Sequence, residues 1–252
     1  MTEPIIKLQH VGLHFGPLVV HRDVSFSVEK GESLTILGPS GAGKTLILKM
    51  IAGLLRPTDG CVFVRGQQLD LLSEDELRPI RRRIGVLFQG AALFDSLDTY
   101  ENIAYSLREA RHRDETEVAE RVKKCLEVVG LPGIEHKLPS ELSGGQKKRV
   151  GLARALISSP EIMLFDEPTT GLDPTSTRLI DDLIIKLRQE LGITCISVTH
   201  DIASARRISD RWILIHNGGI AADGPASALV EDDALVKQFI EGNWKEELHC
   251  LG

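Results

Sequence analysis

The sequence of 252 residues contains only four cysteines, and they are scattered along the chain: Cys61, Cys125, Cys195 and Cys250. This spacing gives neither the close pairs of a structural zinc site nor a small disulfide framework. Reduced thiols in a cytosol fit the pattern best. The first four residues also lack the basic and apolar regions of a secretory signal.

Long apolar runs are absent as well. The best runs, such as residues 212–215, are far shorter than the roughly 20 mostly apolar residues of a membrane-spanning helix. We therefore expect any membrane role to depend on a partner. An excess of positive charge is also missing, because the net charge is -6 and the pI is near 5.8. Nucleic-acid binding usually needs a basic face, so no nucleic-acid partner is predicted.

The one basic cluster lies at Arg78-Pro79-Ile80-Arg81-Arg82-Arg83. A solvated face is the favoured interpretation, and contact with a permease or an anionic lipid is the alternative. The rest of the composition, 42% hydrophobic and 26% charged, is ordinary for a globular protein. The length suits a single α/β core with a smaller lobe attached.

Short apolar segments alternate with helical patterns along most of the chain. Residues 5–11 and 24–28 predict strands that flank a loop at 14–17, and with 61–65 they form a small β lobe. Continuous apolar runs predict buried strands at residues 33–37, 84–88, 162–165 and 193–199. Apolar stripes predict helices at residues 44–55, 114–129, 147–156 and 175–191. This order predicts a parallel sheet wrapped by crossover helices.

Residues 38–45 match the phosphate-loop pattern G-x-x-x-x-G-K-[ST] in full, between a predicted strand and a predicted helix. Such glycines let backbone N–H groups converge on phosphates at a helix N-terminus. Lys44 supplies a cation to the β and γ phosphates, and the Thr45 hydroxyl can ligate Mg²⁺. A purely structural glycine turn is the weaker interpretation. The predicted nucleotide contacts here are Gly38, Pro39, Ser40, Gly41, Ala42, Gly43, Lys44, Thr45 and Leu46.

Two adjacent acids follow the apolar run 162–165. Asp166 is expected to hold the magnesium ion, directly or through water. Glu167 is expected to orient or deprotonate the attacking water. Adjacent acids on a loop are often only solvated, but the phosphate loop upstream favours the catalytic interpretation. Three predicted strands thus deliver chemistry at their carboxyl ends, with His200 following the third, and ligands of open α/β sheets bind at that edge.

Leu142-Ser143-Gly144-Gly145-Gln146 precedes the helical run 147–156. Its N–H groups make a second candidate anion site, although Ser-Gly-Gly also occurs in plain turns. Two anion sites, of which only one carries a lysine, are explained if two chains meet head to tail and share each nucleotide.

The segments 38–45, 142–146, 166–167 and 171–173, with Gln89 and His200, occur in the order and approximate spacing of ABC transporter nucleotide-binding subunits. This resemblance covers nearly the whole chain. It implies a P-loop NTPase fold of ABC type, in which a parallel-sheet core carries a small antiparallel β lobe and an inserted helical subdomain. One domain, 1–252, then comprises a core of residues 1–88 and 160–227, a helical signature subdomain of residues 89–159, and a C-terminal tail of residues 228–252.

The resemblance also implies roles for residues that would say little alone. Gln89 would sense Mg²⁺ and water, and His200 would contact the γ-phosphate. Glu167, His200 and Lys44 would be the catalytic residues. Phe15 would stack on adenine in place of the commoner tyrosine, with ordinary packing as the alternative. Ser143, Gly144, Gly145 and Gln146 would cap the ATP of a second copy, and Asp173 would lie in the loop that signals across that dimer. The cofactors implied are ATP and Mg²⁺.

Within this family, residues 88–94, 102–109 and 236–242 resemble the ATPase subunits of Mla/Mce-type phospholipid transporters. Ser106 departs from a proline often seen there. The resemblance implies a peripheral location at the cytoplasmic face of a bacterial inner membrane. It also implies an integral permease and an Mce-like lipid-binding subunit as partners.

Two other interpretations remain open at this stage. A soluble ABC ATPase of the iron-sulfur cluster assembly kind would act as a scaffold without a permease. A small-molecule kinase on the same phosphate loop would leave residues 142–146 unexplained. The C-terminal tail is predicted to regulate or brace a dimer, because Leu235, Val236, Phe239 and Ile240 give it an amphipathic pattern.

Overall fold

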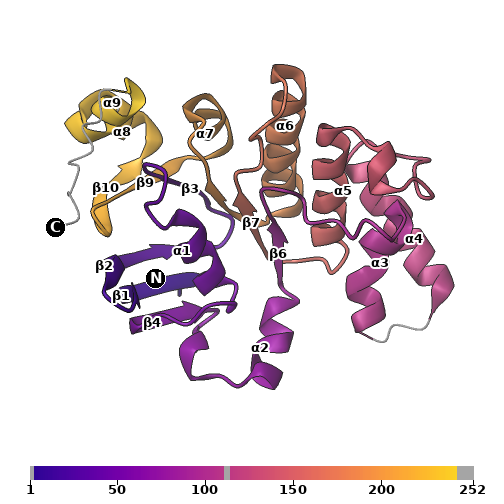
Figure 1. The fold of residues 1–252 in the computed structure, drawn as a ribbon, viewed down its shortest axis with the longest axis horizontal. Coiled ribbons are helices and arrows are strands. Elements are labelled where there is room, and N and C mark those ends of the chain that lie inside the picture. The colour runs from indigo at the N-terminus through magenta and orange to yellow at the C-terminus, as the bar shows by residue number, and fades with distance from the viewer. Residues whose placement is uncertain (1–2, 111–113, 243–252) are drawn as a thin grey trace.

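The computed structural model describes residues 3–110 and 114–242, and Figure 1 shows their arrangement. One sheet runs through the described chain. Its strands, in spatial order, are β5 (Gln67–Gln68), β4 (Asp59–Val64), β1 (Ile6–Phe15), β2 (Leu18–Val28), β10 (Gly219–Pro225), β9 (Arg211–His216), β3 (Ser33–Leu37), β8 (Thr194–Val198), β7 (Ile162–Asp166) and β6 (Ile84–Leu87).

The two halves of the sheet differ in strand direction. Strands β9, β3, β8, β7 and β6 pair in parallel, whereas β5, β4, β1 and β2 form an antiparallel lobe. The predicted parallel core with a small antiparallel lobe is confirmed. Cys250 and the last ten residues of the expected tail lie outside the described residues.

The lobe strands are longer than their sequence pattern suggests. The loop expected at 14–17 is a turn of Gly16 and Pro17 only, because β1 and β2 stay paired up to Phe15 and Leu18. Register shifts fall between Leu8 and Val11 and again toward Leu13. Each such irregularity breaks the alternation of inward and outward side chains, so the strand pattern fades before the strand ends.

Helices surround the sheet, and those near the signature segment gather at one end of the molecule, away from the β lobe (Figure 1). The α-helices are α1 (Lys44–Ile51), α2 (Glu74–Arg81), α3 (Thr99–Glu109), α4 (Glu115–Val128), α5 (Gly144–Leu156), α6 (Pro174–Leu191), α7 (Ile202–Ile208), α8 (Ala226–Asp232) and α9 (Ala234–Ile240). Helix α1 ends before the expected residue 55, because Gly53 takes a left-handed φ of 67°. Helix α5 begins at Gly144 rather than Lys147, since the glycines form its first turn.

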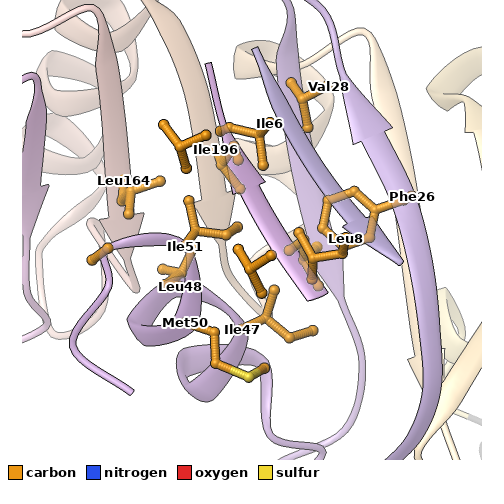
Figure 2. Close-up of a cluster of buried hydrophobic side chains, with 14 of the residues drawn as sticks. Ile6, Leu8, Phe26, Val28, Ile47, Leu48, Met50, Ile51, Leu164 and Ile196 are labelled. Carbon is orange, nitrogen blue, oxygen red and sulfur yellow. The ribbon is translucent and has the colours of Figure 1, made fainter. Parts of the chain in front are cut away.

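The core joins the lobe to the parallel sheet through α1. Figure 2 shows Ile47, Leu48 and Ile51 of this helix gathered in one cluster with lobe side chains such as Leu8 and core side chains such as Leu164. A second apolar cluster packs α3, α4 and α5 against β6 and β7. Because α1 is fixed on both sides, the loop before it is held at the carboxyl edge of the sheet.

The C-terminal helices are part of the packed molecule. Val236 of α9 is buried in a cluster with Trp212 and Leu214 of β9. The boundary expected between residues 227 and 228 falls inside α8. None of the helices in the described ranges is long and apolar enough to cross a membrane.

Candidate nucleotide-binding site

A pocket of about 430 Å³ lies where the phosphate loop meets the ends of β6, β7 and β8. It brings together side chains from four segments that are distant in the sequence. Its lining residues are Ser40, Gly41, Gly43, Lys44, Thr45, Leu46, Gln89, Glu167, Val198 and His200. The remaining loop residues Gly38, Pro39 and Ala42 complete the connection from β3 to α1.

The phosphate loop needs glycine for its shape. Gly38, Gly41 and Gly43 take φ values of 151°, 79° and 80°, and a β-carbon on Gly38 would lie 2.6 Å from the Ile215 carbonyl oxygen. Gly43 caps α1 without a side-chain hydrogen bond. The first N–H groups of α1 are therefore not consumed by a cap, which suits an anion.

Lys44 supplies the positive charge of the loop. Its Nζ donates to the carbonyl oxygens of Gly38 and Pro39, both at 2.8 Å. Burial lowers the pKa of Lys44, while the nearby carboxylates of Glu167 and Asp166 raise it. An ammonium held among backbone carbonyls can exchange these acceptors for phosphate oxygens.

Thr45 and Asp166 form a pair of oxygen groups beside the lysine. The Thr45 Oγ1 donates to Asp166 Oδ1 at 2.7 Å, and Asp166 is buried at the end of β7. Gln89 adds an amide oxygen from beyond the end of β6. Mg²⁺ prefers a few protein oxygens together with water and phosphate, and this donor set fits that preference. The described residues hold no cluster of three or more His, Cys, Asp or Glu that would bind a metal by itself.

Glu167 is held in place on several sides. Its Oε1 lies 2.9 Å from His200 Nδ1, and its Oε2 accepts from Thr170 Oγ1 at 2.8 Å. Its main-chain oxygen accepts from Lys148 Nζ at 2.9 Å. A carboxylate only accepts, so His200 Nδ1 carries the proton in this contact. The arrangement fixes a carboxylate beside the phosphate loop, as a general base requires.

Sequence reasoning did not identify Lys148 or Thr170. Lys148 lies on α5 with only 5% of its surface exposed, and burial lowers its pKa. A signal was present, because Lys148 shares the buried stripe of Leu152 and Leu156 at helical spacing. Thr170 carried no such signal, since its contact with Glu167 depends on the turn after β7.

The signature segment does not line this pocket. Ser143 and Gln146 form a capping box at the start of α5, with Ser143 N donating to Gln146 Oε1 at 2.9 Å. Gly144 and Gly145 form the first turn, and a β-carbon on Gly145 would lie 3.0 Å from Ser176 Oγ. Asp173 caps α6 by accepting from Ser176 N at 3.0 Å. The two candidate anion sites of one chain are therefore separate in space.

Phe15 lies at the end of β1 and is also absent from the pocket lining. Its side chain is 48% exposed, next to the turn that leads to the exposed Leu18. The ordinary packing considered as the alternative for Phe15 would therefore lie at the surface and not in the core. Adenine stacking stays a prediction.

Several known proteins are similar to this chain in sequence. The family model described as ABC transporter matches residues 21–170. The chain is 40% identical over 238 residues to the probable ribonucleotide transport ATP-binding protein mkl of Mycobacterium leprae, covering 94% of this chain and 69% of that protein. It is 39% identical over 243 residues to the intermembrane phospholipid transport system ATP-binding protein MlaF of Haemophilus influenzae, covering 96% and 92%.

A solved structure agrees. The dimeric ATP-binding cassette MJ0796, in a post-hydrolysis state bound to ADP and Pi, superposes with a TM-score of 0.81 at 34% identity, covering 88% of this chain and 98% of that chain. The family match, the sequence identities and the fold agree on one family. The chain belongs to the ABC transporter family, as an ATP-binding subunit with ATPase activity.

Proposed function

We propose that this chain hydrolyses Mg-ATP as a head-to-tail pair and thereby drives a membrane permease that moves phospholipid between bacterial membranes. The observation that carries the proposal is the separation of the signature segment from the pocket of its own chain. A second copy would place Ser143, Gly144, Gly145 and Gln146 over the ATP, with Asp173 at the contact. The dimeric state of the MJ0796 cassette supports this arrangement.

Different residues around the pocket would bind the metal, bind the phosphates and accept the proton. Thr45, Asp166 and Gln89 would hold Mg²⁺, which would draw charge from the β and γ phosphates. Lys44 would bind the same phosphates, and His200 would contact the γ-phosphate. Glu167 would take a proton from the attacking water, because its carboxylate is held at the pocket.

A groove beside the loop that follows Gln89 suits a permease. It has a volume of about 640 Å³, and its walls come from α2, β6, α3 and α5. Arg78, Arg82, Phe88 and Tyr105 contribute basic and aromatic surface to it. We assign it to a cytoplasmic helix of the permease, which would locate the chain at the cytoplasmic face of the inner membrane. This also gives the basic cluster at 78–83 a partner.

Phospholipid as the cargo is supported by the MlaF relative, which is named as part of an intermembrane phospholipid transport system and 92% of which is covered by the alignment. The mycobacterial relative carries a different substrate in its name, and 69% of it is covered. An Mce-like lipid-binding subunit is proposed as a further partner on the strength of the MlaF likeness.

The test is a tagged pulldown from detergent-solubilised native membranes, with mass spectrometry of the proteins and lipids recovered. We expect a multi-spanning permease, an Mce-like protein and phospholipid. Tyr105→Arg in the groove should lose the permease, whereas Lys123→Glu on the exposed face of α4 should retain it. Recovery of soluble partners alone would contradict the proposal and favour an assembly ATPase.

A further inference from the structure

A histidine side chain lies buried beneath the phosphate loop. His21, on β2, has 0% relative exposure, and its Nε2 lies 3.2 Å from the carbonyl oxygen of Gly43. The ring also packs under the Gly43 α-carbon, because a β-carbon added there would fall 2.7 Å from Nε2 and 2.5 Å from Val20 Cγ1. Only glycine leaves room for this contact, so strand and loop fit together at this point.

The hydrogen-bond partners define the protonation of the ring. A carbonyl oxygen only accepts, so Nε2 carries the proton and donates to Gly43. Nδ1 of His21 is buried without a hydrogen-bond partner among the described residues. A proton on Nδ1 would therefore be a buried donor with no acceptor. Burial lowers the pKa of His21, and the bond to Gly43 raises it to a smaller extent. The ring is a neutral donor whose one bond goes to the phosphate loop.

This bond acts on the peptide that joins Gly43 to Lys44. The Gly43 C=O and the Lys44 N–H belong to one planar trans peptide and point in opposite directions. The same carbonyl accepts from the amide nitrogens of Leu46 at 2.8 Å and Ile47 at 3.2 Å, along α1. His21 adds a donor from a different element. It therefore fixes the plane of the Gly43–Lys44 peptide bond, whose N–H lies at the N-terminus of α1, where the phosphates are expected to bind.

We propose that His21 is a positioning residue for ATP, which aims the Lys44 amide at the phosphates by holding the Gly43 carbonyl. The proposal rests on the proposed role of residues 38–45 as the ATP phosphate site. His21 is buried and does not line the pocket, so it would act through the loop and not by contact with the nucleotide. Its contribution is to nucleotide affinity, and not to the chemical step.

His21→Leu separates this role from simple packing. The change removes the Nε2 donor and the unpartnered Nδ1 together and leaves an apolar side chain in a buried position. The Gly43 carbonyl keeps its two helix donors. We expect an unchanged or higher melting temperature, a KM and Kd for Mg-ATP raised roughly 2- to 10-fold, and a kcat near the parental value. A merely structural histidine would lower the melting temperature and leave affinity unchanged.

Two amides of different length provide matched controls in the full chain. His21→Gln places an N–H donor near the position of Nε2, and we expect it to restore ATP affinity. His21→Asn places its amide near Nδ1, too short to reach Gly43, and should bind ATP as weakly as the leucine variant. If glutamine and asparagine behave alike, the hydrogen bond is not the cause and the proposal is overturned.

Lys44→Ala tests the phosphate site at residues 38–45 separately from the role of His21. If that variant binds ATP as the parent does, the assignment of the phosphate site fails, and the His21 proposal fails with it. If Lys44→Ala loses ATP while His21→Leu keeps parental affinity, the phosphate site stands and only the His21 proposal is overturned. If Lys44→Ala loses ATP binding and His21→Leu weakens it by roughly the expected 2- to 10-fold, both the phosphate site and the role of His21 are supported.

Discussion

Glu167 combines an uncommon backbone conformation with a well-supported side chain. Its φ is 50°, in the left-handed region that non-glycine residues rarely occupy. Its N–H donates to the Val198 carbonyl at 2.9 Å, and Lys148 binds its main-chain oxygen. Such a conformation costs on the order of 1–3 kcal/mol and persists where the surroundings fix it. Here the surroundings hold the carboxylate at the pocket, where the proposed chemistry needs it.

We expect Glu167→Gln to bind ATP like the parent and to hydrolyse it roughly 100- to 10,000-fold more slowly. The amide oxygen of a glutamine can still accept from His200, and its nitrogen can donate to the Thr170 hydroxyl, but the amide cannot accept a proton from water. Nucleotide titration and phosphate release measure the two properties separately. Glu190→Gln, at an exposed glutamate near the end of α6, should hydrolyse ATP normally. Parental hydrolysis by Glu167→Gln would remove Glu167 from the mechanism.

Most residues of the pocket were predictable because each follows a strand in the sequence. Parallel strands deliver their carboxyl ends to one edge, so Lys44, Glu167 and His200 converge whatever the details of packing. His21 and Lys148 were not predictable in the same way. Each reaches a backbone carbonyl of a segment distant in sequence, and that contact exists only in the folded molecule.

At the scale of elements, α5 must lie close to β6 for the helical subdomain to stay attached to the sheet. Gly85 of β6 makes this approach possible, because a β-carbon there would lie 2.3 Å from Met163 Sδ and 2.8 Å from the Ala155 carbonyl oxygen. The glycine is required by space and not by backbone conformation. Sequence patterns did not reveal this, since a glycine within an apolar run gives no indication of the neighbour it faces.

We expect Gly85→Ala to destabilise the chain, because overpacking costs about 1–3 kcal/mol. For a chain of this size the melting temperature should fall by roughly 3–10 °C in a thermal unfolding scan. Gly90→Ala is the matched control, because nothing lies within 4 Å of its added β-carbon. Equal melting temperatures for the two variants would show that β6 and α5 have room to separate.

Helices α4 and α3 differ in how well the local sequence pattern predicts them, because α3 depends on contacts with the loop that precedes it. The start of α4 was predicted, because Asp114 caps it by accepting from Glu117 N at 3.1 Å. Helix α3 was not predicted from periodicity. It is capped by Asp98, which accepts from Glu101 N at 2.8 Å, and Asn102 of its first turn is buried in bonds to the preceding loop. A buried polar residue on an inward face obscures the apolar stripe of a helix.

At the scale of the whole molecule, the chain is built around two separated anion sites. The phosphate loop sits on α1, between the β lobe and the parallel sheet, whereas the signature segment begins α5 in the helical subdomain (Figure 1). The sequence predicted both sites, and the head-to-tail interpretation already required them to lie apart within one chain. How the helical subdomain packs to separate them is seen only in the folded molecule. The packing of Gly145 against Ser176 links the signature segment to the helix that Asp173 caps. The start of α5 and the start of α6 are therefore in contact within one chain.

The most direct test of the shared-site account is the mass of Glu167→Gln in solution by sedimentation, with and without saturating Mg-ATP. The account predicts a single chain of 27.7 kDa without nucleotide and twice that mass with it. Adding Gly144→Arg, at an exposed position whose nearest neighbour in its own chain is 3.7 Å from an added β-carbon, should abolish the dimer while ATP still binds. A Glu167→Gln chain that binds Mg-ATP to saturation and stays at 27.7 kDa would contradict the account.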